Sequence, residues 1–274
     1  MNFASALRHE LAVRALKYAE SKALRHSLSY GEMPAICFLP HEHQFHHGNF
    51  APASYRAIVS NPVWRQRLDK VHTHGRRSLP PKEGGRWREL DSCNSSDALL
   101  MNIFCHPGIL RRGRLLAMLG LDTAVEMRFG YKARVPLVSG KYDRTEVDLR
   151  IGNLLVEAKL TEGDFQKAEK KVMSAYRDFF EVFDGDALPQ IDGHYVSYQL
   201  LRNVLAAHAL QCSLCVLLDG RRLDLREAWY AVMKCVRPVG LRTALKLLTW
   251  QELAATLPFR LQTFLEIKYG IFTS

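Results

Sequence analysis

The stretch TEVDLRIGNLLVEAKL, residues 145–160, constrains the fold of this chain more than any other part of its sequence. Apolar residues at positions 147, 149 and 151 alternate with charged residues at 148 and 150, which is the period-two pattern of a half-buried strand. Gly152 and Asn153 then suit a two-residue turn, because glycine is favoured at the first central position of such hairpins. Residues 154–160 return as a second strand. The sequence therefore predicts an antiparallel hairpin.

A two-residue turn fixes the register of this hairpin and brings charged side chains together. In that register Asp148 lies directly opposite Glu157, and Lys159 shares their face opposite Glu146. Opposed residues in an antiparallel pair have Cβ atoms about 5 Å apart, and like charges there are unfavourable. The two carboxylates must therefore be separated by a cation, share a proton or splay into water.

A divalent cation between the carboxylates would explain their position. Mg²⁺ prefers oxygen ligands and usually takes one or two carboxylates together with phosphate oxygens and water. Lys159 beside such an ion would hold a nucleophilic water or stabilise charge that develops on a phosphoryl oxygen. The alternative is a solvated sheet face on which the Glu146–Lys159 and Asp148–Arg150 neighbours balance their charges locally.

Asp148 followed by Glu157-Ala158-Lys159 on a hairpin resembles the signature of the PD-(D/E)XK nuclease superfamily, which has the restriction endonuclease-like fold. Val147 stands where that signature usually has proline. Residues 160–162 (LTE) and 198–203 (YQLLRN) resemble a bacterial restriction-endonuclease-like branch. The resemblance extends over roughly residues 49–269, and only the hairpin residues are specific to the chemistry.

This resemblance implies a catalytic site. Asp148 and Glu157 would be metal ligands, together with the backbone carbonyl of Ala158, and the metal would be Mg²⁺ or Mn²⁺. Lys159 would orient or deprotonate the attacking water. The implied reaction is hydrolysis of a phosphodiester bond, and the expected substrate is DNA.

A further candidate catalytic residue lies on a helix predicted over residues 194–210. Gln199 resembles the glutamine of a QxxxY motif found in several exonuclease branches, but Asn203 occupies the tyrosine position, so the match is partial. An amide at this place would hold a water molecule or a phosphate oxygen near the metal. The alternative is that Gln199 is an ordinary buried or surface amide.

The order of the predicted elements agrees with an αβββαβ core. A helix over about 96–105, another that ends at Leu119 and a strand over 125–137 precede the hairpin. The elements predicted after the hairpin are helices over 164–183 and 194–210, a strand over 213–218, a helix over 224–235, a strand over 241–249 and two C-terminal helices. The predicted fold class is α/β, an α+β mixed sheet of the restriction endonuclease-like type.

The chain is expected to divide into a helical and irregular N-terminal extension, residues 1–90, and a nuclease domain, residues 91–274. The extension contains a histidine-rich stretch over residues 41–47, which reads either as a transition-metal site or as a polar loop. The resemblance also implies an additional acidic ligand or a scaffold contact on a helix before the sheet. The candidates are Glu89, Asp91 and Asp97, and the sequence does not select among them.

Residues 64–88 form a strongly basic segment with interleaved aromatic and histidine residues. Lysine and arginine neutralise phosphates, and exposed aromatic rings stack on bases. The segment therefore predicts contacts with the backbone of a nucleic acid, and a solvated face is the alternative. The arginines assigned to nucleic-acid binding are Arg76, Arg77, Arg86 and Arg88.

Composition supports an anionic partner. The 274 residues carry a formal charge of +10, with a pI near 9.4, which favours nucleic acid first and a membrane surface second. No apolar segment reaches membrane-spanning length and no signal-peptide pattern begins the chain, so a cytoplasmic protein is expected. The six cysteines, Cys212 and Cys215 among them, are expected to be reduced, and these two to lie in the core.

The sequence thus predicts a metal-dependent nuclease that acts on DNA. One rival is a catalytically inactive nucleic-acid-binding or assembly module on the same fold, and another is a histidine-dependent metalloenzyme built on residues 41–47 with His72 and His74. The sequence leaves four questions open: the base specificity, whether the substrate is DNA or RNA, whether attack is endo- or exonucleolytic, and whether the chain forms a homodimer.

Overall fold

The computed structural model describes residues 2–29, 34–39, 46–71, 73–74, 77–78, 88–122 and 126–273. The chain forms two compact units. Unit 1 contains Met1–Thr123 and Trp250–Ser274, and unit 2 contains Ala124–Thr249. The C-terminal segment thus belongs to the same unit as the N-terminal segment, and the division expected after residue 90 stays a prediction.

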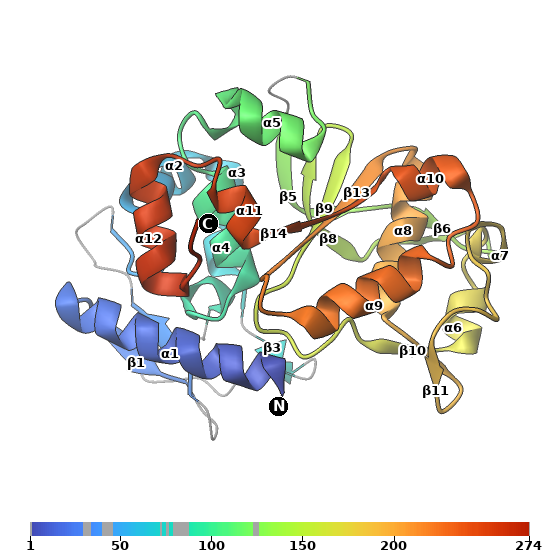
Figure 1. The fold of residues 1–274 in the computed structure, drawn as a ribbon, viewed down its shortest axis with the longest axis horizontal. Coiled ribbons are helices and arrows are strands. Elements are labelled where there is room, and N and C mark those ends of the chain that lie inside the picture. The colour runs from blue at the N-terminus through green and yellow to red at the C-terminus, as the bar shows by residue number, and fades with distance from the viewer. Residues whose placement is uncertain are drawn as a thin grey trace. The chain divides into compact units, whose positions relative to one another are not determined.

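Unit 2 is built on a five-stranded mixed sheet with the order β14-β13-β9-β8-β5 (Figure 1). The β5–β8 and β8–β9 pairs are antiparallel, whereas β9–β13 and β13–β14 are parallel. The strands are β5 (Met127–Lys132), β8 (Glu146–Ile151), β9 (Leu154–Ala158), β13 (Ser213–Leu218) and β14 (Leu245–Thr249). The fold is therefore α/β with a mixed sheet, as the alternation of strand and helix patterns predicts.

The predicted hairpin is β8 and β9, joined by Gly152 and Asn153. Gly152 has a φ of 51°, in the left-handed region that favours glycine. The register predicted from the two-residue turn is confirmed for the three pairs nearest to it, the last of which joins Leu149 and Val156. Val147, Leu149 and Ile151 are buried, so the period-two pattern is confirmed as well.

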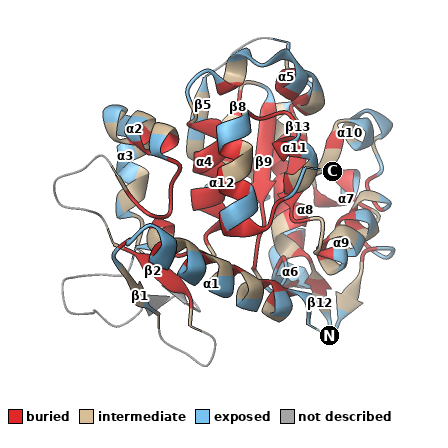
Figure 2. Ribbon diagram, turned by 60° about the vertical axis from the view of Figure 1, so that its left-hand side comes forward, coloured by how far each residue is buried: buried red, intermediate tan, exposed pale blue. Residues whose placement is uncertain are grey.

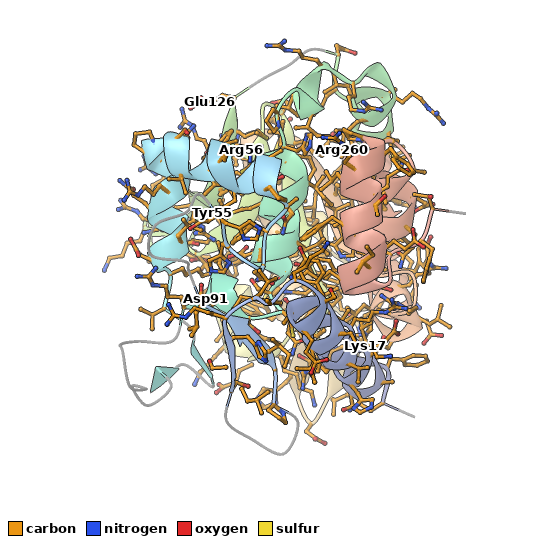
Figure 3. All side chains as sticks on the ribbon, turned by 90° about the vertical axis from the view of Figure 1, so that its left-hand side faces the viewer. Lys17, Tyr55, Arg56, Asp91, Glu126 and Arg260 are labelled. Atoms are coloured by element: carbon orange, nitrogen blue, oxygen red, sulfur yellow. The ribbon has the colours of Figure 1, made fainter. Side chains whose placement is uncertain are left out.

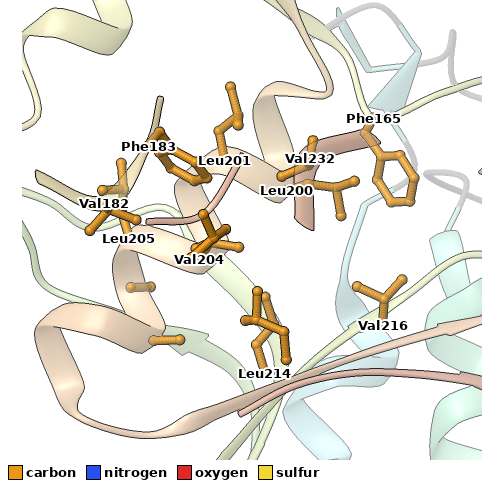
Figure 4. Close-up of a cluster of buried hydrophobic side chains, with 14 of the residues drawn as sticks. Phe165, Val182, Phe183, Leu200, Leu201, Val204, Leu205, Leu214, Val216 and Val232 are labelled. Carbon is orange, nitrogen blue, oxygen red and sulfur yellow. The ribbon is translucent and has the colours of Figure 1, made fainter. Parts of the chain in front are cut away.

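Helix α8 (Tyr198–Leu210) and helix α9 (Leu223–Met233) supply apolar side chains to the core of unit 2. Figure 4 shows Leu200, Val204 and Leu205 of α8 with Leu214 and Val216 of β13. All of these side chains are buried, and packing of this kind stabilises an amphipathic helix more than its intrinsic propensity does. The central strand β9 is buried at every residue.

The helix predicted over residues 164–183 is wrong. The segment contains β10 (Lys167–Glu169) and two short helices, α6 (Lys170–Ser174) and α7 (Phe179–Val182). Gln166 has a φ of 63°, which stops a right-handed helix, and β10 instead pairs with β12 (His194–Val196), which also pairs with β11 (Gln190–Ile191). The apolar stripe is therefore out of phase, with Val172 exposed and Met173 buried.

Other predicted boundaries shift by a few residues. The strand expected over 125–137 is divided into β5 and β6 (Val135–Pro136), and β6 pairs with β7 (Tyr142–Asp143). The helix expected from residue 194 begins at Tyr198, because Ser197 adopts a φ of 64°. Residues 239–243 form a short helix, α10, before β14. The strand over 213–218 and the helix over 224–235 are confirmed as β13 and α9.

Unit 1 is mainly helical and has its own core. Its longer helices are α1 (Phe3–Ser21), α2 (Pro52–Ser60), α4 (Ser96–Phe104) and α12 (Phe259–Tyr269), and α1 packs against α12. Helix α4 is buried at every residue (Figure 2). Its predicted start is confirmed, since the Ser95 side chain accepts a hydrogen bond from the Ala98 N–H. The other elements of unit 1 are β1 (His26–Leu28), β2 (Ile36–Phe38), α3 (Pro62–Arg65), β3 (Thr73–His74), β4 (Arg77–Ser78), α5 (Gly113–Leu119), α11 (Trp250–Ala254) and 3₁₀ turns at Gln66–Asp69, Glu89–Asp91 and Ile109–Arg111.

Lys268, near the end of α12, is a buried lysine without a carboxylate beside it among its described hydrogen-bond partners. Its ammonium donates to the side-chain and backbone oxygens of Asn49 and, at 2.9 Å, to the Tyr269 hydroxyl. It also lies over the rings of Phe38, Phe264 and Tyr269, with the Tyr269 centroid 4.2 Å away. Burial lowers the pKa of Lys268 to about 7.

Candidate active site

Glu157 and Lys159 form a buried ion pair at the end of β9. The Lys159 Nζ lies 2.8 Å from the Glu157 Oε1, and the side chains are only 6% and 3% exposed. The backbone continues the parallel pairing here, because the Lys159 N–H donates to the Leu217 carbonyl of β13 at 2.8 Å. Strand β9 therefore presents both side chains from the middle of the sheet.

Asp148 is half-buried on β8, and it is attached to β9 through its side chain. The Asp148 Oδ2 accepts a hydrogen bond of 2.7 Å from the backbone N–H of Ala158. The described β8–β9 ladder ends at the pair of Leu149 and Val156, before the expected opposition of Asp148 and Glu157. The Ala158 N–H is thus satisfied by a carboxylate. The structure brings Asp148, Ala158, Glu157 and Lys159 into one region, and their assignment as a catalytic site stays a prediction.

The structure adds two residues that sequence reasoning did not select as catalytic, Arg202 and Asn203 of α8. The Asn203 Nδ2 donates to the Glu157 Oε2 at 2.7 Å, and the Asn203 Oδ1 accepts from the Arg202 Nη2 at 2.8 Å. The same Arg202 nitrogen donates to the backbone carbonyl of Glu146 on β8 at 2.8 Å. Both side chains are buried. The available signal was their place in the YQLLRN run, three and four residues after the candidate glutamine.

The charges around Lys159 keep it cationic. Burial lowers the pKa of Lys159, but the surrounding carboxylates, Glu157 first and then Glu162 and Asp148, raise it by more, so the net pKa lies above its ordinary value. Glu162 also caps the strand end, because its Oε2 accepts from the Leu160 N–H at 2.6 Å. The site therefore contains an ammonium compensated by carboxylates, inside a buried part of the fold.

A buried arginine holds the loop that follows Lys159. Arg222 is fully buried, and its guanidinium donates to the carbonyls of Leu160 and Gly163, both at 3.2 Å. It also makes two hydrogen bonds to the carboxylate of Asp224, at 2.9 and 2.8 Å. Bidentate pairing of this kind fixes the guanidinium plane, so the loop carbonyls have a rigid partner.

Gln199 does not join this network. Its side chain is half-buried and has no described hydrogen bond, while its backbone N–H donates to the Phe165 carbonyl at 2.9 Å. The amide that reaches Glu157 comes instead from Asn203, one helical turn further along α8. A catalytic role for Gln199 stays a prediction.

The donor set suits a hard divalent cation. Two carboxylates and a backbone carbonyl are oxygen ligands of the type that Mg²⁺ accepts. Within the described residues, no three or more His, Cys, Asp or Glu side chains gather into a metal-binding cluster. Any ion here would therefore depend on Asp148, Glu157 and the Ala158 carbonyl, with water or substrate oxygens as its remaining ligands.

The three upstream acidic candidates lie in unit 1 and have partners there. Asp97 is buried and accepts from Arg67 at 2.8 Å and from Lys70 at 2.7 Å, and Glu89 accepts from Lys70 at 3.1 Å. Burial raises the pKa of Asp97, but the two cations lower it by more, so the net pKa is below its ordinary value. Asp91 pairs with a histidine. These contacts give each carboxylate a structural role.

The histidine-rich stretch is described only from residue 46 onward, and residues 41–45 lie outside the described part. His47 is buried, with its Nε2 3.0 Å from the Asp91 Oδ1, while its Nδ1 accepts from the Asn49 N–H at 3.1 Å. Its ring also lies beside that of Tyr55, and Figure 3 labels Tyr55 and Asp91. Both nitrogens of His47 are thus engaged within unit 1. The six cysteines are free and buried, and the core position predicted for Cys212 and Cys215 is confirmed.

Much of the basic segment lies outside the described residues. Arg76 and Arg86 lie outside the described residues, and only the backbone of Arg77 is described, in β4. Arg88 is exposed and lies 3.4 Å from Asp69. The predicted nucleic-acid contacts of these four arginines stay a prediction.

The fold and the site define an α/β protein with a mixed sheet and a carboxylate–lysine cluster at the end of its central strand. The chain belongs to the family described as Restriction Endonuclease associating with ARP, whose model matches residues 12–270. It is thus a member of a restriction-endonuclease-related family. No curated protein and no solved structure matches it. None of the helices in the described ranges is long and apolar enough to cross a membrane.

Proposed function

We propose that this protein is a metal-dependent nuclease that hydrolyses phosphodiester bonds in DNA, on the restriction endonuclease-like αβββαβ core of the PD-(D/E)XK superfamily. The observation that carries the proposal is the approach of Lys159 to Glu157, 2.8 Å apart, with Asp148 bonded to the residue between them. Membership of the restriction-endonuclease-related family supports it. So does the strand order, in which the hairpin is followed by a parallel strand.

Asp148, Glu157 and the Ala158 carbonyl would hold Mg²⁺ or Mn²⁺. The ion, when bound, would supply a Lewis acid for a phosphoryl oxygen and lower the pKa of a bound water. Lys159 would orient the attacking water and stabilise negative charge on the phosphoryl group, because its ammonium is fixed by Glu157. Gln199 would contribute an amide at the edge of the site.

Nucleic acid is the proposed substrate because the chain carries a formal charge of +10. Arg76, Arg77, Arg86 and Arg88 would contact its phosphates. Neutralising these four arginines is expected to weaken DNA binding, and each lost phosphate contact removes about one unit from the slope of log K against log salt. An unchanged slope would show that the segment is a solvated face. We further propose a cytoplasmic setting and a protein partner of the kind named in the family's description, ARP.

The test of catalysis uses two variants that keep the shape of the ligands. Asp148→Asn and Glu157→Gln each remove one ligand charge, and both are expected to abolish cleavage of plasmid, linear and single-stranded DNA in Mg²⁺ or Mn²⁺. EDTA should abolish cleavage by the wild type. Glu126→Gln is the matched control, because the Glu126 carboxylate is exposed and pairs with Arg128 at 2.9 Å. A folded ligand variant that cuts at the wild-type rate would refute the site.

The second candidate function is a catalytically inactive nucleic-acid-binding or assembly module on the same fold. It is favoured by the state of Glu157, both of whose oxygens already accept from protein donors, Lys159 and Asn203. In that case the wild type binds DNA with the same salt dependence but does not cut it with either metal. The cleavage assay above therefore separates the two functions.

A further inference from the structure

We infer that Asn203, locked by Arg202, is the positioning residue that holds Glu157 ready for a divalent cation, an inference that rests on the proposed function. Neither residue would touch the substrate. Their contribution is to fix which carboxylate oxygen of Glu157 faces Asn203 and which faces Lys159.

The first step is the contact itself. The Asn203 Nδ2 lies 2.7 Å from the Glu157 Oε2, and Asn203 is fully buried. A buried amide without partners costs about 1–3 kcal/mol, so buried amides are kept where their hydrogen bonds are satisfied. Here one of those bonds is made to the candidate ligand itself.

The second step is the direction of the amide. An asparagine side chain can rotate by half a turn and exchange its oxygen with its nitrogen. The Arg202 Nη2 prevents this, because it can only donate and it lies 2.8 Å from the Asn203 Oδ1. The amide nitrogen must therefore face Glu157, and rotation would place two oxygens against each other.

The third step is the anchor of Arg202. Its Nη2 also donates to the backbone carbonyl of Glu146, at 2.8 Å. Glu146 lies on β8, two residues before Asp148. The chain of contacts thus runs from the strand of one candidate ligand, through α8, to the carboxylate of the other. It ties the spacing of Asp148 and Glu157 to a single helix.

The consequence concerns competition with Lys159. Both carboxylate oxygens of Glu157 attract the Lys159 ammonium. Because the Glu157–Lys159 pair is buried, solvent ions screen this attraction only weakly. Asn203 donates to the Oε2 at 2.7 Å, while the Lys159 ammonium lies 2.8 Å from the Oε1, so the two donors are assigned to different oxygens. Without Asn203, the carboxylate would turn both oxygens to Lys159, and a metal ion would have to displace that stronger pair.

The experiment measures binding of Mn²⁺ alone to the full chain, by electron paramagnetic resonance of free Mn²⁺. Asn203→Ala is expected to weaken binding about 10–100-fold, the usual effect of losing a residue that orients a ligand. Asn203→Leu fills the same space without a donor and should give the same loss. DNA cleavage and the melting temperature in EDTA are recorded for the wild type and for each variant.

Asn102→Ala is the matched control. Asn102 is also a fully buried helical amide, and its Nδ2 donates to the carbonyls of Asn49 and Ala98, both at 2.9 Å. Its loss is expected to lower the melting temperature without changing Mn²⁺ affinity per folded molecule. A purely structural role for Asn203 would give the same pattern.

The outcomes separate two failures. If wild type binds Mn²⁺ and Glu157→Gln does not, the metal site stands, and unchanged affinity in the Asn203 variants overturns the positioning role alone. If wild type itself binds no Mn²⁺, both the proposed function and this inference fall. Loss of folded protein in both Asn203 variants also overturns the inference, because Asn203 would then serve the fold.

Discussion

Replacing Lys159 by methionine removes a charge from a buried pair and keeps the aliphatic part of the side chain. The pair is 2.8 Å long with side chains 6% and 3% exposed, so Glu157 would lose its cation without gaining water. Removing one member of a buried ion pair costs about 3–5 kcal/mol. Glu157 retains the Asn203 donor, which places the expected loss near the lower end, about 3 kcal/mol. Domains are stable by only about 5–15 kcal/mol, so this loss is measurable.

The same variant should respond more strongly to metal. In EDTA the Glu157 carboxylate of Lys159→Met is uncompensated, and a divalent cation would take the place of the lost ammonium. Ligand at about 100 times its dissociation constant stabilises a protein by about 2.7 kcal/mol, and tighter binding adds to this. We therefore expect Mn²⁺ to raise the melting temperature of the variant more than that of the wild type. Cleavage should nevertheless fall about 100-fold or more, as for other positioned catalytic groups.

The assay is thermal unfolding in EDTA and in Mn²⁺, with single-turnover cleavage on the same samples. Lys171→Met is the control, because Lys171 pairs with Glu169 at 2.9 Å on the surface, where its side chain is 80% exposed. An exposed pair is worth at most about 1 kcal/mol, so this control should be nearly silent. Wild-type stability in EDTA together with wild-type cleavage in Lys159→Met would refute both the buried-pair argument and the catalytic role.

Three further predictions concern other buried charges. The pKa of Lys268 is lowered to about 7, so between pH 7 and about 10 the unfolded chain binds more protons than the folded chain. The free energy of unfolding of the wild type should therefore rise by about 1.4 kcal/mol per pH unit relative to that of Lys268→Met. Urea unfolding at pH 6 and pH 9 tests this, and a difference independent of pH would contradict it. The pKa of Asp97 is lowered, so its contribution to the free energy of unfolding is present at neutral pH and lost in acid. Asp97→Asn should cost about 3–5 kcal/mol at pH 7, and its difference in stability from wild type should shrink as the pH falls below about 4. An equal difference at pH 7 and pH 3 would exclude the ion pairs as its source. Arg222→Met removes the donors to the carbonyls of Leu160 and Gly163, so proteolysis of the loop that follows Lys159 should become faster and the free energy of unfolding should fall by about 1–3 kcal/mol. Unchanged proteolysis would mean that the loop does not depend on the arginine.

The sequence predicted the parts of this fold that depend on neighbours in the chain. The hairpin follows from alternation and from Gly152, and its register from the length of the turn. Strand β13 is confirmed because it is a short apolar run followed by a turn, and helix α9 is confirmed with its buried residues at helical spacing. The helix expected over 164–183 was wrong because residues 167–169 pair instead with β12, which lies further along the chain. The periodicity of one segment does not indicate such pairing.

The candidate site divides in the same way. The proximity of Asp148, Glu157 and Lys159 could be predicted from the hairpin alone, because Asp148 lies on β8, Glu157 lies on β9 and Lys159 follows directly after the end of β9. The hydrogen bond from Asn203 was not, because it depends on how α8 lies over the sheet. Helix packing of this kind is set by tertiary contacts and not by the residues of one element.

The central place of β9 in the sheet has a consequence for hydrogen exchange. Strands β8 and β13 flank β9 on its two sides, and every residue of β9 is buried. Amides in such positions become accessible to solvent deuterium only when the whole unit opens, whereas edges and loops exchange through local fluctuations. The amides of Val156, Glu157 and Lys159 are therefore expected among the slowest to exchange in unit 2. Heat inactivation would then follow the cooperative loss of this unit, without a partly folded form that has lost the site and kept the sheet.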